Sequence, residues 1–543
     1  MPAPEWSNIR PAALVGDPVY SSEEGKNETG FCSMSLSFGV PLEHHKPDRK
    51  TDTLTLHSTL VYADHDPDTN MPGNEAVKDW AIKRRAAQWH KIVCRRPFML
   101  YLCGGPGDGN NHRRIPGLNR WALDQGYQVL YVDYRGTGRS RPFIDNAHLS
   151  EIGSSPADRA AYLALFRQDN IARDLEAIRL CLIHPKNLVK WTLVGQSFGG
   201  WVALTYASFL PSSLAAIYLT AGLAPVGRSP RDVYTRLYRR VAERNEAYYR
   251  MFPDDVDLVR KIAVHLYYHA PGPITREDGG GYAYRVEGHK GKQRLTAQLF
   301  LTLGRCFGAM PTTSVSQTEE GEKLRPFHRV HALVQRMAAD IASEGVLSEE
   351  TVAEYVAMQT KAREGGPSCA GFRLHERPLY GVMHEAIYCH GPGVVAGWAA
   401  RDVGRAYDSG EFSWLRNSFE GNPAKGGRLF FAGEMIFPSM LAAGGSSLRA
   451  FRDAAEVLAQ KDDWPALYDE QQLSARNRVP MRAIAYKDDM YVDLDLSLET
   501  GAKIRKCVVV EAKEGWGHGA IKEADKSDQV LEMLFGSKTP SRR

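Results

Sequence analysis

No stretch of the 543 residues is apolar over the roughly 18 positions that a membrane-spanning helix needs, so we expect no membrane partner. The first residues, Met1-Pro-Ala-Pro-Glu-Trp-Ser7, contain neither the basic nor the apolar region of a secretory signal, and we expect none. No Cys-x-x-Cys pair occurs among the eight scattered cysteines, which favours free thiols in a reducing compartment over disulfides or a zinc site. We therefore predict a cytoplasmic protein.

Neither sign of charge dominates, because 68 Lys and Arg stand against 64 Asp and Glu, for a net charge of +4. This balance does not indicate nucleic acid or an anionic surface as a partner. An apolar content of 43% and a charged content of 24% are those of an ordinary globular protein. The length suggests two or three folding units, and nothing in the sequence defines the oligomeric state.

Metal and phosphate motifs are also missing. His384 and His390 are six residues apart, whereas two ligands on one face of a helix need a spacing of four. The glycine-rich segment at 104–107 lacks both the Gly-x-Gly-x-x-Gly pattern and a following Gly-Lys-Ser/Thr. We therefore expect no metal and no cofactor.

The most informative stretch is residues 191–200, where a short apolar run of strand type leads into Gly195-Gln-Ser197-Phe-Gly199. A helix-length apolar segment follows directly. A bare Gly-x-Ser-x-Gly often arises by chance, but a strand before it and a helix after it are the context of a nucleophile elbow. Gly195 and Gly199 leave room for the tight turn, and Gly200 lets the helix pass close to the sheet. We therefore predict that Ser197 is a nucleophile at the carboxyl end of a central strand.

Strand-like apolar runs alternate with helical segments around this stretch, which predicts a mostly parallel sheet covered on both faces. The predicted core strands lie at 97–103, 127–133, 191–196, 215–220, 479–486 and 504–511. Residues 1–50 show no regular pattern, and other expected elements are a half-exposed edge strand at 51–62, a polar helix around 158–179 and a closing helix at 527–535. Between 223 and 475 the pattern is largely helical and rich in charge. The sequence thus predicts an α/β core, residues 1–222 and 476–543, split by a helical cap of residues 223–475.

A serine hydroxyl is a poor nucleophile at neutral pH and needs an imidazole that a carboxylate orients. In an α/β-hydrolase the acid and the histidine follow the serine in that order, each after a strand. Asp488 and Asp489 both follow the strand at 479–486, and on position alone they are alternatives. His518 lies in a glycine-flanked turn after the strand at 504–511.

Hydrolysis of an acyl group also needs backbone N–H donors for the oxyanion of the tetrahedral intermediate. One donor is expected from Phe198, the residue after the nucleophile. The other is expected from the glycine-rich turn 104–107, which leaves the strand at 97–103.

Several motifs now form a recognisable combination. Those of the core are Cys-Gly-Gly-Pro-Gly at 103–107, Asp-Tyr-Arg-Gly-Thr-Gly-Arg-Ser at 133–140, Gly-Gln-Ser-Phe-Gly-Gly at 195–200 and Tyr-Lys-Asp-Asp-Met-Tyr-Val at 486–492. Those of the predicted cap lie at 232–241, 384–389, 433–438 and 461–468. The combination resembles the proline iminopeptidases (prolyl aminopeptidases), serine peptidases of the α/β-hydrolase fold, and the cap motifs resemble their longer-chain branch. The resemblance covers most of residues 95–540.

The resemblance implies a metal-independent serine exopeptidase that releases proline from peptides with N-terminal proline. It assigns Ser197 as the nucleophile and His518 as the base and then the acid. The later of the two aspartates, Asp489, is implied as the residue that orients the histidine. The implied oxyanion donors are Gly105 and Phe198.

An exopeptidase must recognise a free amino terminus, and a cationic prolyl nitrogen calls for buried or half-buried carboxylates in the cap. The family uses glutamates there. Glu385 is the first candidate in this sequence and Glu434 the second. The alternative for each is a glutamate on a helix surface or in a salt bridge.

Two positions depart from the family pattern. Cys103 stands where the usual His-Gly-Gly-Pro-Gly has its histidine, and Trp516-Gly-His518-Gly519 replaces a Glu-His-Asn setting. Neither changes the predicted triad, but both bear on substrate preference. The alternative function is an esterase, amidase, lactonase or epoxide hydrolase that acts on a hydrophobic small molecule, and a third is a non-catalytic binding protein on the same fold.

Overall fold

The computed structural model describes most of the chain. The described residues are 4–20, 31–45, 53–63, 96–140, 152–153, 155–182, 190–268, 282–285, 292–308, 326–359, 377–407, 410–415, 423–425, 427–443, 446–523 and 525–536. None of the helices in these ranges is both long enough and apolar enough to cross a membrane.

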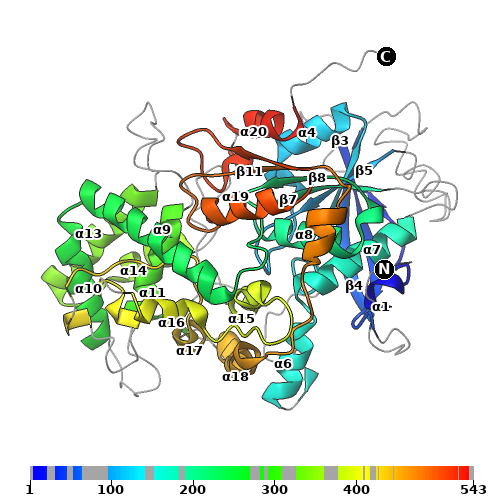
Figure 1. Ribbon diagram of the computed structural model, residues 1–543. Helices are drawn as coiled ribbons and strands as arrows, with labels where there is room; N and C mark the ends of the chain where they lie inside the picture. The colour runs from blue at the N-terminus through cyan, green and yellow to red at the C-terminus, as the bar shows by residue number, and fades with distance from the viewer. Residues whose placement is uncertain are drawn as a thin grey trace.

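Within the described residues, ten strands form one sheet in the order β1-β3-β4-β6-β5-β7-β8-β11-β12, with β2 beside β3 (Figure 1). The strands are β1 Ala13–Leu14, β2 Val19–Tyr20, β3 Phe31–Pro41, β4 Thr53–Ala63, β5 Phe98–Leu102, β6 Gln128–Val132, β7 Trp191–Gln196, β8 Leu214–Thr220, β11 Met481–Ala485 and β12 Cys507–Glu511. The run from β6 to β12 is parallel throughout, and β3 and β4 are antiparallel additions. The predicted mostly parallel sheet and its core strands are therefore confirmed.

Two predictions for the N-terminal part are wrong. Residues 1–50, expected to be irregular, contain the eleven-residue strand β3. Its apolar side chains alternate with serines, which is the pattern of a strand. The pattern is short and turn-forming residues flank it in the sequence, which favours an irregular segment. The predicted edge strand, β4, lies between β3 and β6 and is buried on both faces over its second half. Its partner is β3, and no local sequence pattern predicts the pairing of these two strands.

Helices of the core cover the sheet on both faces (Figure 1). They are α1 Pro4–Ser7, α4 Pro116–Asp124, α6 Pro156–Ala164, α7 Gln168–Leu182, α8 Phe198–Phe209, α19 Leu494–Lys503 and α20 Ser527–Phe535. The closing helix α20 has the predicted bounds. The prediction of a single helix around 158–179 is wrong, because the structure has two helices there, α6 and α7. The first ends at Ala164, and the carbonyl oxygen of Leu165 accepts a 2.8 Å hydrogen bond from Arg135.

The chain between β8 and β11 is mainly helical, and its helices gather to one side of the sheet (Figure 1). They are α9 Pro230–Met251, α10 Asp255–Tyr268, α11 Ala297–Leu301, α13 Pro326–Glu344, α14 Glu349–Gln359, α15 Pro378–Met383, α16 Ala399–Arg405, α17 Pro438–Ala443 and α18 Ser446–Gln460. A short antiparallel hairpin, β9 Tyr282–Arg285 and β10 Lys292–Leu295, was not predicted. The domain boundaries after residues 222 and 475 stay predictions.

Short 3₁₀ helices and one π-helix complete the described structure. They are η2 His112–Arg114, η3 Pro211–Ser213, η4 Thr302–Gly308, η5 Ala386–Tyr388, η6 Ser413–Leu415, η7 Pro423–Lys425, the π-helix η8 Gln472–Arg476 and η9 Ala520–Lys522. Two of them, η2 and η9, lie next to the predicted catalytic turns in sequence.

The long helix α9 shows how local sequence starts the helical segment. The Ser229 side chain accepts a hydrogen bond from the Asp232 amide, and the Asp232 carboxylate accepts one from the Ser229 amide. This reciprocal capping satisfies two of the amides that a helix start leaves unpaired, and Pro230 fits the first helical position. Apolar residues at helical spacing, beginning with Val233 and Tyr234, then turn one face into the core.

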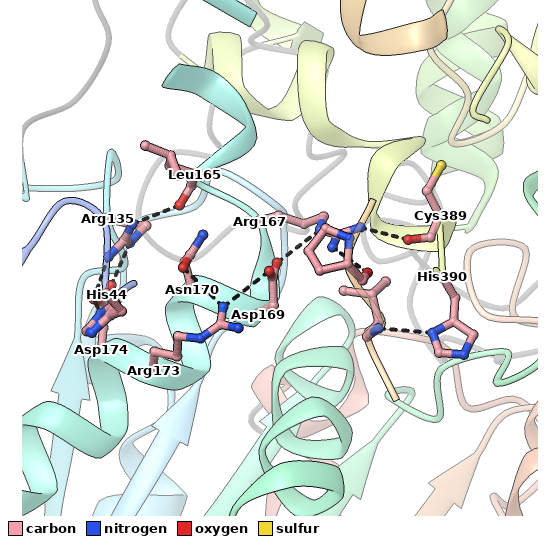
Figure 2. A network of polar contacts seen from close by, with 12 residues as sticks. His44, Arg135, Leu165, Arg167, Asp169, Asn170, Arg173, Asp174, Cys389 and His390 are labelled. Carbon is pink, nitrogen blue, oxygen red and sulfur yellow. Dashed lines mark hydrogen bonds and ion pairs between the residues drawn. The ribbon is translucent and has the colours of Figure 1, made fainter. Parts of the chain in front are cut away.

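A buried junction ties the start of α7 to the helical segment (Figure 2). The guanidinium of Arg167 donates hydrogen bonds to the carbonyl oxygens of Cys389, at 2.7 Å, and Pro465, at 2.9 Å. Its Nε contacts Asp169 Oδ1 at 2.9 Å, and its plane lies 4.5 Å from the centre of the Trp464 ring. We call Arg167 and these four partners the Arg167 junction. The junction joins the core to the helical segment at two places, Cys389 and Pro465.

Candidate active site

The turn between β7 and α8 has the geometry of a nucleophile elbow. Ser197 has φ 52° and ψ −128°, a backbone conformation that costs free energy in any residue but glycine and persists only where packing enforces it. A Cβ added at Gly199 would lie 2.1 Å from the carbonyl oxygen of Leu102, and one at Gly200 would lie 1.7 Å from that of Gly222. The glycines therefore allow α8 to start against the backbone of the neighbouring strands, with Ser197 at the strand end.

Asp489, and not Asp488, contacts the predicted catalytic histidine. Its Oδ2 lies 2.7 Å from Nδ1 of His518. Its Oδ1 accepts hydrogen bonds from the backbone amides of Tyr491, at 2.8 Å, and Val492, at 3.0 Å. The Asp489 residue is 1% exposed, so this carboxylate is held by three donors in a dry setting, whereas Asp488 is half-exposed. Such an arrangement fixes the orientation of the imidazole.

The loop that carries His518 lies beside the elbow. The side-chain amide of Gln196 donates a 3.3 Å hydrogen bond to the carbonyl oxygen of His518. Strands β7, β8, β11 and β12 are parallel neighbours, so Ser197, Asp489 and His518 all follow strand ends at the same edge of the sheet. Because Nδ1 faces Asp489, Nε2 is the ring nitrogen that remains for the serine.

The glycine-rich turn after β5 lies against the elbow. A Cβ added at Gly104 would be 3.2 Å from Cβ of Ser197 and 3.6 Å from its Oγ. Gly105 has φ +134°, which glycine adopts readily. Within the described chain, neither the Gly105 amide nor the Phe198 amide donates a hydrogen bond to another residue. Both predicted oxyanion donors thus lie next to the nucleophile with their N–H groups available.

Glu434 is connected through its neighbours to both the glycine-rich turn and the histidine. Its Oε1 accepts hydrogen bonds from the Tyr380 hydroxyl, at 2.5 Å, and from the Arg305 guanidinium, at 3.0 Å. The backbone amide of Tyr380 would be 3.0 Å from a Cβ at Gly107. On the other side, the Tyr491 hydroxyl donates to the carbonyl oxygen of Arg305, and the Tyr491 ring packs edge-on against His518 with 4.8 Å between centroids.

The charge on Glu434 follows from these neighbours. Burial alone would raise the pKa of its carboxyl, but the contacts with His384, Arg305 and Tyr380 hold that pKa well below its usual range. Glu434 is therefore an anion at neutral pH. Its second oxygen, Oε2, is the freer one, and His384 Nε2 lies 4.0 Å from it.

Glu385 has a different environment. Its two oxygens accept hydrogen bonds from the backbone amides of Ala399, at 3.1 Å, and Ala400, at 2.9 Å, at the start of α16. Burial raises the pKa of Glu385 to about 8, and the two amide contacts lower it only in part. The side chain is thus mostly neutral at pH 7 and already anchors a helix start.

Sequence reasoning missed the side chains that surround Glu434. Arg305 reaches it from η4, and Tyr380 and His384 reach it from α15 and its C-terminal end. Tyr491 in turn contacts both Arg305 and His518. Only Tyr491 and His384 lay inside motifs that the sequence singled out. No local signal marked Arg305 or Tyr380, because their role depends on contacts across the fold.

The described residues contain no group of three or more His, Cys, Asp or Glu side chains that could hold a metal ion. The six described cysteines are all free thiols.

Comparison with known proteins agrees with this geometry. The family described as alpha/beta hydrolase fold matches residues 97–261. A proline iminopeptidase from Aeromonas sobria is 34% identical over 467 residues, which are 85% of this chain and 87% of the relative. The proline iminopeptidase aneH from Aspergillus aculeatus is 31% identical over 537 residues, 98% of each chain. The chain belongs to the proline iminopeptidase family.

Membership of the proline iminopeptidase family confirms the predicted resemblance and the α/β-hydrolase fold. Among solved structures, the crystal structure of a proline iminopeptidase from Mycobacterium smegmatis aligns with 88% of this chain and 93% of its own, at 12% identity and a TM-score of 0.34. A similarity this low gives no information about individual side chains.

Proposed function

We propose that the protein is a serine aminopeptidase that releases N-terminal proline from peptides, without a metal or cofactor. Family membership over nearly the whole chain supports this activity. The observation that carries it is the ionised Glu434, which is connected through Arg305 and Tyr491 to His518. An anion connected in this way to a catalytic histidine suits a substrate whose reacting acyl group carries a cationic nitrogen.

In the acylation step, Nε2 of His518 takes the proton of Ser197 while Oγ attacks the prolyl carbonyl carbon. Asp489 accepts a hydrogen bond from Nδ1–H of His518 and stabilises the imidazolium that forms. The amides of Gly105 and Phe198 donate to the oxyanion, and each such donor typically contributes a few kcal/mol to transition-state stabilisation.

The intermediate collapses when His518 gives its proton to the nitrogen of the leaving peptide and the C–N bond breaks. The proline is then held as an ester of Ser197. A water molecule, deprotonated by His518, attacks this ester, and the proton passes back to Oγ as free proline leaves. Both halves use the same base and the same oxyanion donors.

Glu434 is assigned to bind the prolyl ammonium through Oε2. Its Oε1 is occupied by Tyr380 and Arg305, which keep the carboxylate charged and fixed in place. Glu385, largely neutral and bound to the start of α16, is assigned a supporting role behind this contact. The sequence placed these two glutamates in the opposite order.

The helical segment 223–475 is assigned as the cap that completes this amine site, since Glu434, Arg305, Tyr380 and His384 all belong to it. We also propose the cytoplasm as the location, in keeping with the free thiols. Fractionation of cells that express the protein would test the location.

The proposed activity is tested by cleavage of a panel of amino-acid p-nitroanilides, with p-nitrophenyl acetate as the ester comparison. We expect a strong preference for the proline amide, and Ser197→Ala should lower its turnover by at least about three orders of magnitude. Fast ester turnover without cleavage of the proline amide would instead support an esterase. Failure of a fluorophosphonate probe to label Ser197 in the wild type would support a non-catalytic protein.

A further inference from the structure

One helix of the cap lies against the turn that carries a proposed oxyanion donor. A Cβ added at Gly107 would lie 3.0 Å from the amide nitrogen of Tyr380 and 3.5 Å from Cβ of Leu379, both on α15. The next residue of the turn, Asp108, forms an ion pair with Arg377, the residue at which α15 begins. The turn and α15 are therefore in contact through the backbone and through this ion pair.

Both ends of the glycine-rich turn are fixed to the core. The turn leaves strand β5 at one end, and at the other the backbone amide of Asn110 donates a 2.6 Å hydrogen bond to Asp133. Gly105 lies between these ends. A Cβ added there would be 2.9 Å from the amide nitrogen of Gly107 and 3.1 Å from that of Asp108. Because the three residues pack this closely, the direction of the Gly105 N–H depends on where the other two are held.

The sequence around Arg377 suits a contact with the turn better than a helix start. The first position of a helix is usually Ser, Thr, Asp or Asn, whose side chain caps a free amide. Arg377 occupies this position at α15 and gives the helix no side-chain cap. Its guanidinium pairs with Asp108 instead, and the two side chains are only 23% and 24% exposed. An ion pair sheltered to this degree is screened by salt less than one on the open surface.

The same helix also contacts the proposed amine site. The Tyr380 hydroxyl donates a 2.5 Å hydrogen bond to Oε1 of Glu434. His384, at the C-terminal end of α15, lies 4.0 Å from the second oxygen of that carboxylate. One short helix thus contacts the glycine-rich turn where it begins and the amine-binding carboxylate along its length. A shift of α15 would move both.

We propose that Arg377 and Asp108 are positioning residues for the oxyanion hole. Their ion pair holds the glycine-rich turn against α15, so that the Gly105 amide points at the oxyanion only while this helix of the cap is in place. The proposal rests on the proposed function and adds that a cap residue controls a hydrogen-bond donor of the core. The oxyanion forms in the transition state, so loss of the ion pair lowers kcat rather than substrate affinity.

The test measures kcat and KM for proline p-nitroanilide and for p-nitrophenyl acetate, an ester that also forms an oxyanion but carries no ammonium group. Arg377→Met and Asp108→Asn should each lower kcat for both substrates by about ten- to a hundredfold, the loss that follows a small misplacement of a catalytic group. KM for the proline amide should stay within about twofold of wild type, since no group of the amine site is removed.

Two further variants separate positioning from a general loss of structure. The double variant Arg377→Met/Asp108→Asn should lose no more kcat than either single variant, because both changes break the same contact. Arg377→Lys keeps the charge and should recover most of the wild-type kcat. Additive losses in the double variant, or a wild-type kcat in both single variants, would overturn the positioning role.

Arg228→Met is the matched control. Arg228 also joins the cap segment to the core, through a 2.7 Å ion pair with Glu499 on α19 rather than through the glycine-rich turn. It should keep the wild-type kcat for both substrates, and an equal loss there would overturn the proposal. Wild-type turnover of the ester without any cleavage of the proline amide would overturn the proposed function itself, whereas the ester would still test the role of Arg377 and Asp108.

Discussion

The guanidinium of Arg167 donates a 2.7 Å hydrogen bond to the carbonyl oxygen of Cys389, 222 residues further along the chain. Its second terminal nitrogen donates a hydrogen bond to the carbonyl oxygen of Pro465, and the Asp169 carboxylate pairs with its Nε. Cys389 follows Glu385 by four residues, so this one buried side chain ties the start of α7 to the part of the chain that leads into the proposed amine site. The junction is shown in Figure 2.

We predict that Arg167→Met lowers the free energy of unfolding by about 3–5 kcal/mol, since it leaves Asp169 and two carbonyl groups buried with fewer partners. It should also raise KM for proline p-nitroanilide, because the segment after Glu385 loses its anchor. Thermal unfolding and steady-state kinetics measure the two effects.

Arg179→Met is the matched control for this prediction. Arg179 lies near the C-terminal end of α7, and its guanidinium donates a 2.6 Å hydrogen bond to Glu176 on the same helix. It should lose stability with little change in KM. A KM that moves equally in both variants would show that the junction has no special effect on the substrate site.

Asp489→Asn should lower kcat for proline p-nitroanilide by about three to four orders of magnitude, because an amide cannot hold the imidazole in the required tautomer. Asp488→Asn should stay within a few-fold of wild type, since that side chain does not contact His518. Circular dichroism would show that both variants are folded. Comparable losses in the two variants would contradict the assignment of Asp489.

Glu434→Gln should raise KM for proline p-nitroanilide by about ten- to a hundredfold, the loss expected when a charged hydrogen bond to the ammonium becomes neutral. Glu385→Gln should have a smaller effect, because Glu385 is already mostly neutral at pH 7. Turnover of an N-blocked proline ester is the control, and neither variant should change it as much. A larger KM effect for Glu385→Gln would restore the order that the sequence suggested.

The sequence by itself determined which strands precede the predicted catalytic residues and in what order these residues follow one another. A strand, a Gly-x-Ser-x-Gly turn and an apolar helix are contiguous signals, so the elbow at Ser197 could be read locally, as could the strands that precede Asp489 and His518. The pairing of β3 with β4 could not be predicted from the sequence, because a hydrogen-bonded ladder depends on which distant segment lies beside a strand.

Tertiary structure alone decided which carboxylates are poised for which task. Asp488 and Asp489 are alternatives on position alone; the family resemblance favoured Asp489, and the 2.7 Å approach of His518 to Asp489 is a contact that only the fold shows. Glu385 is buried and Glu434 is half-buried, yet their pKa values move in opposite directions. A carboxyl takes its charge from the donors and cations that the fold brings to it, and for Glu434 those come from segments far apart in the chain.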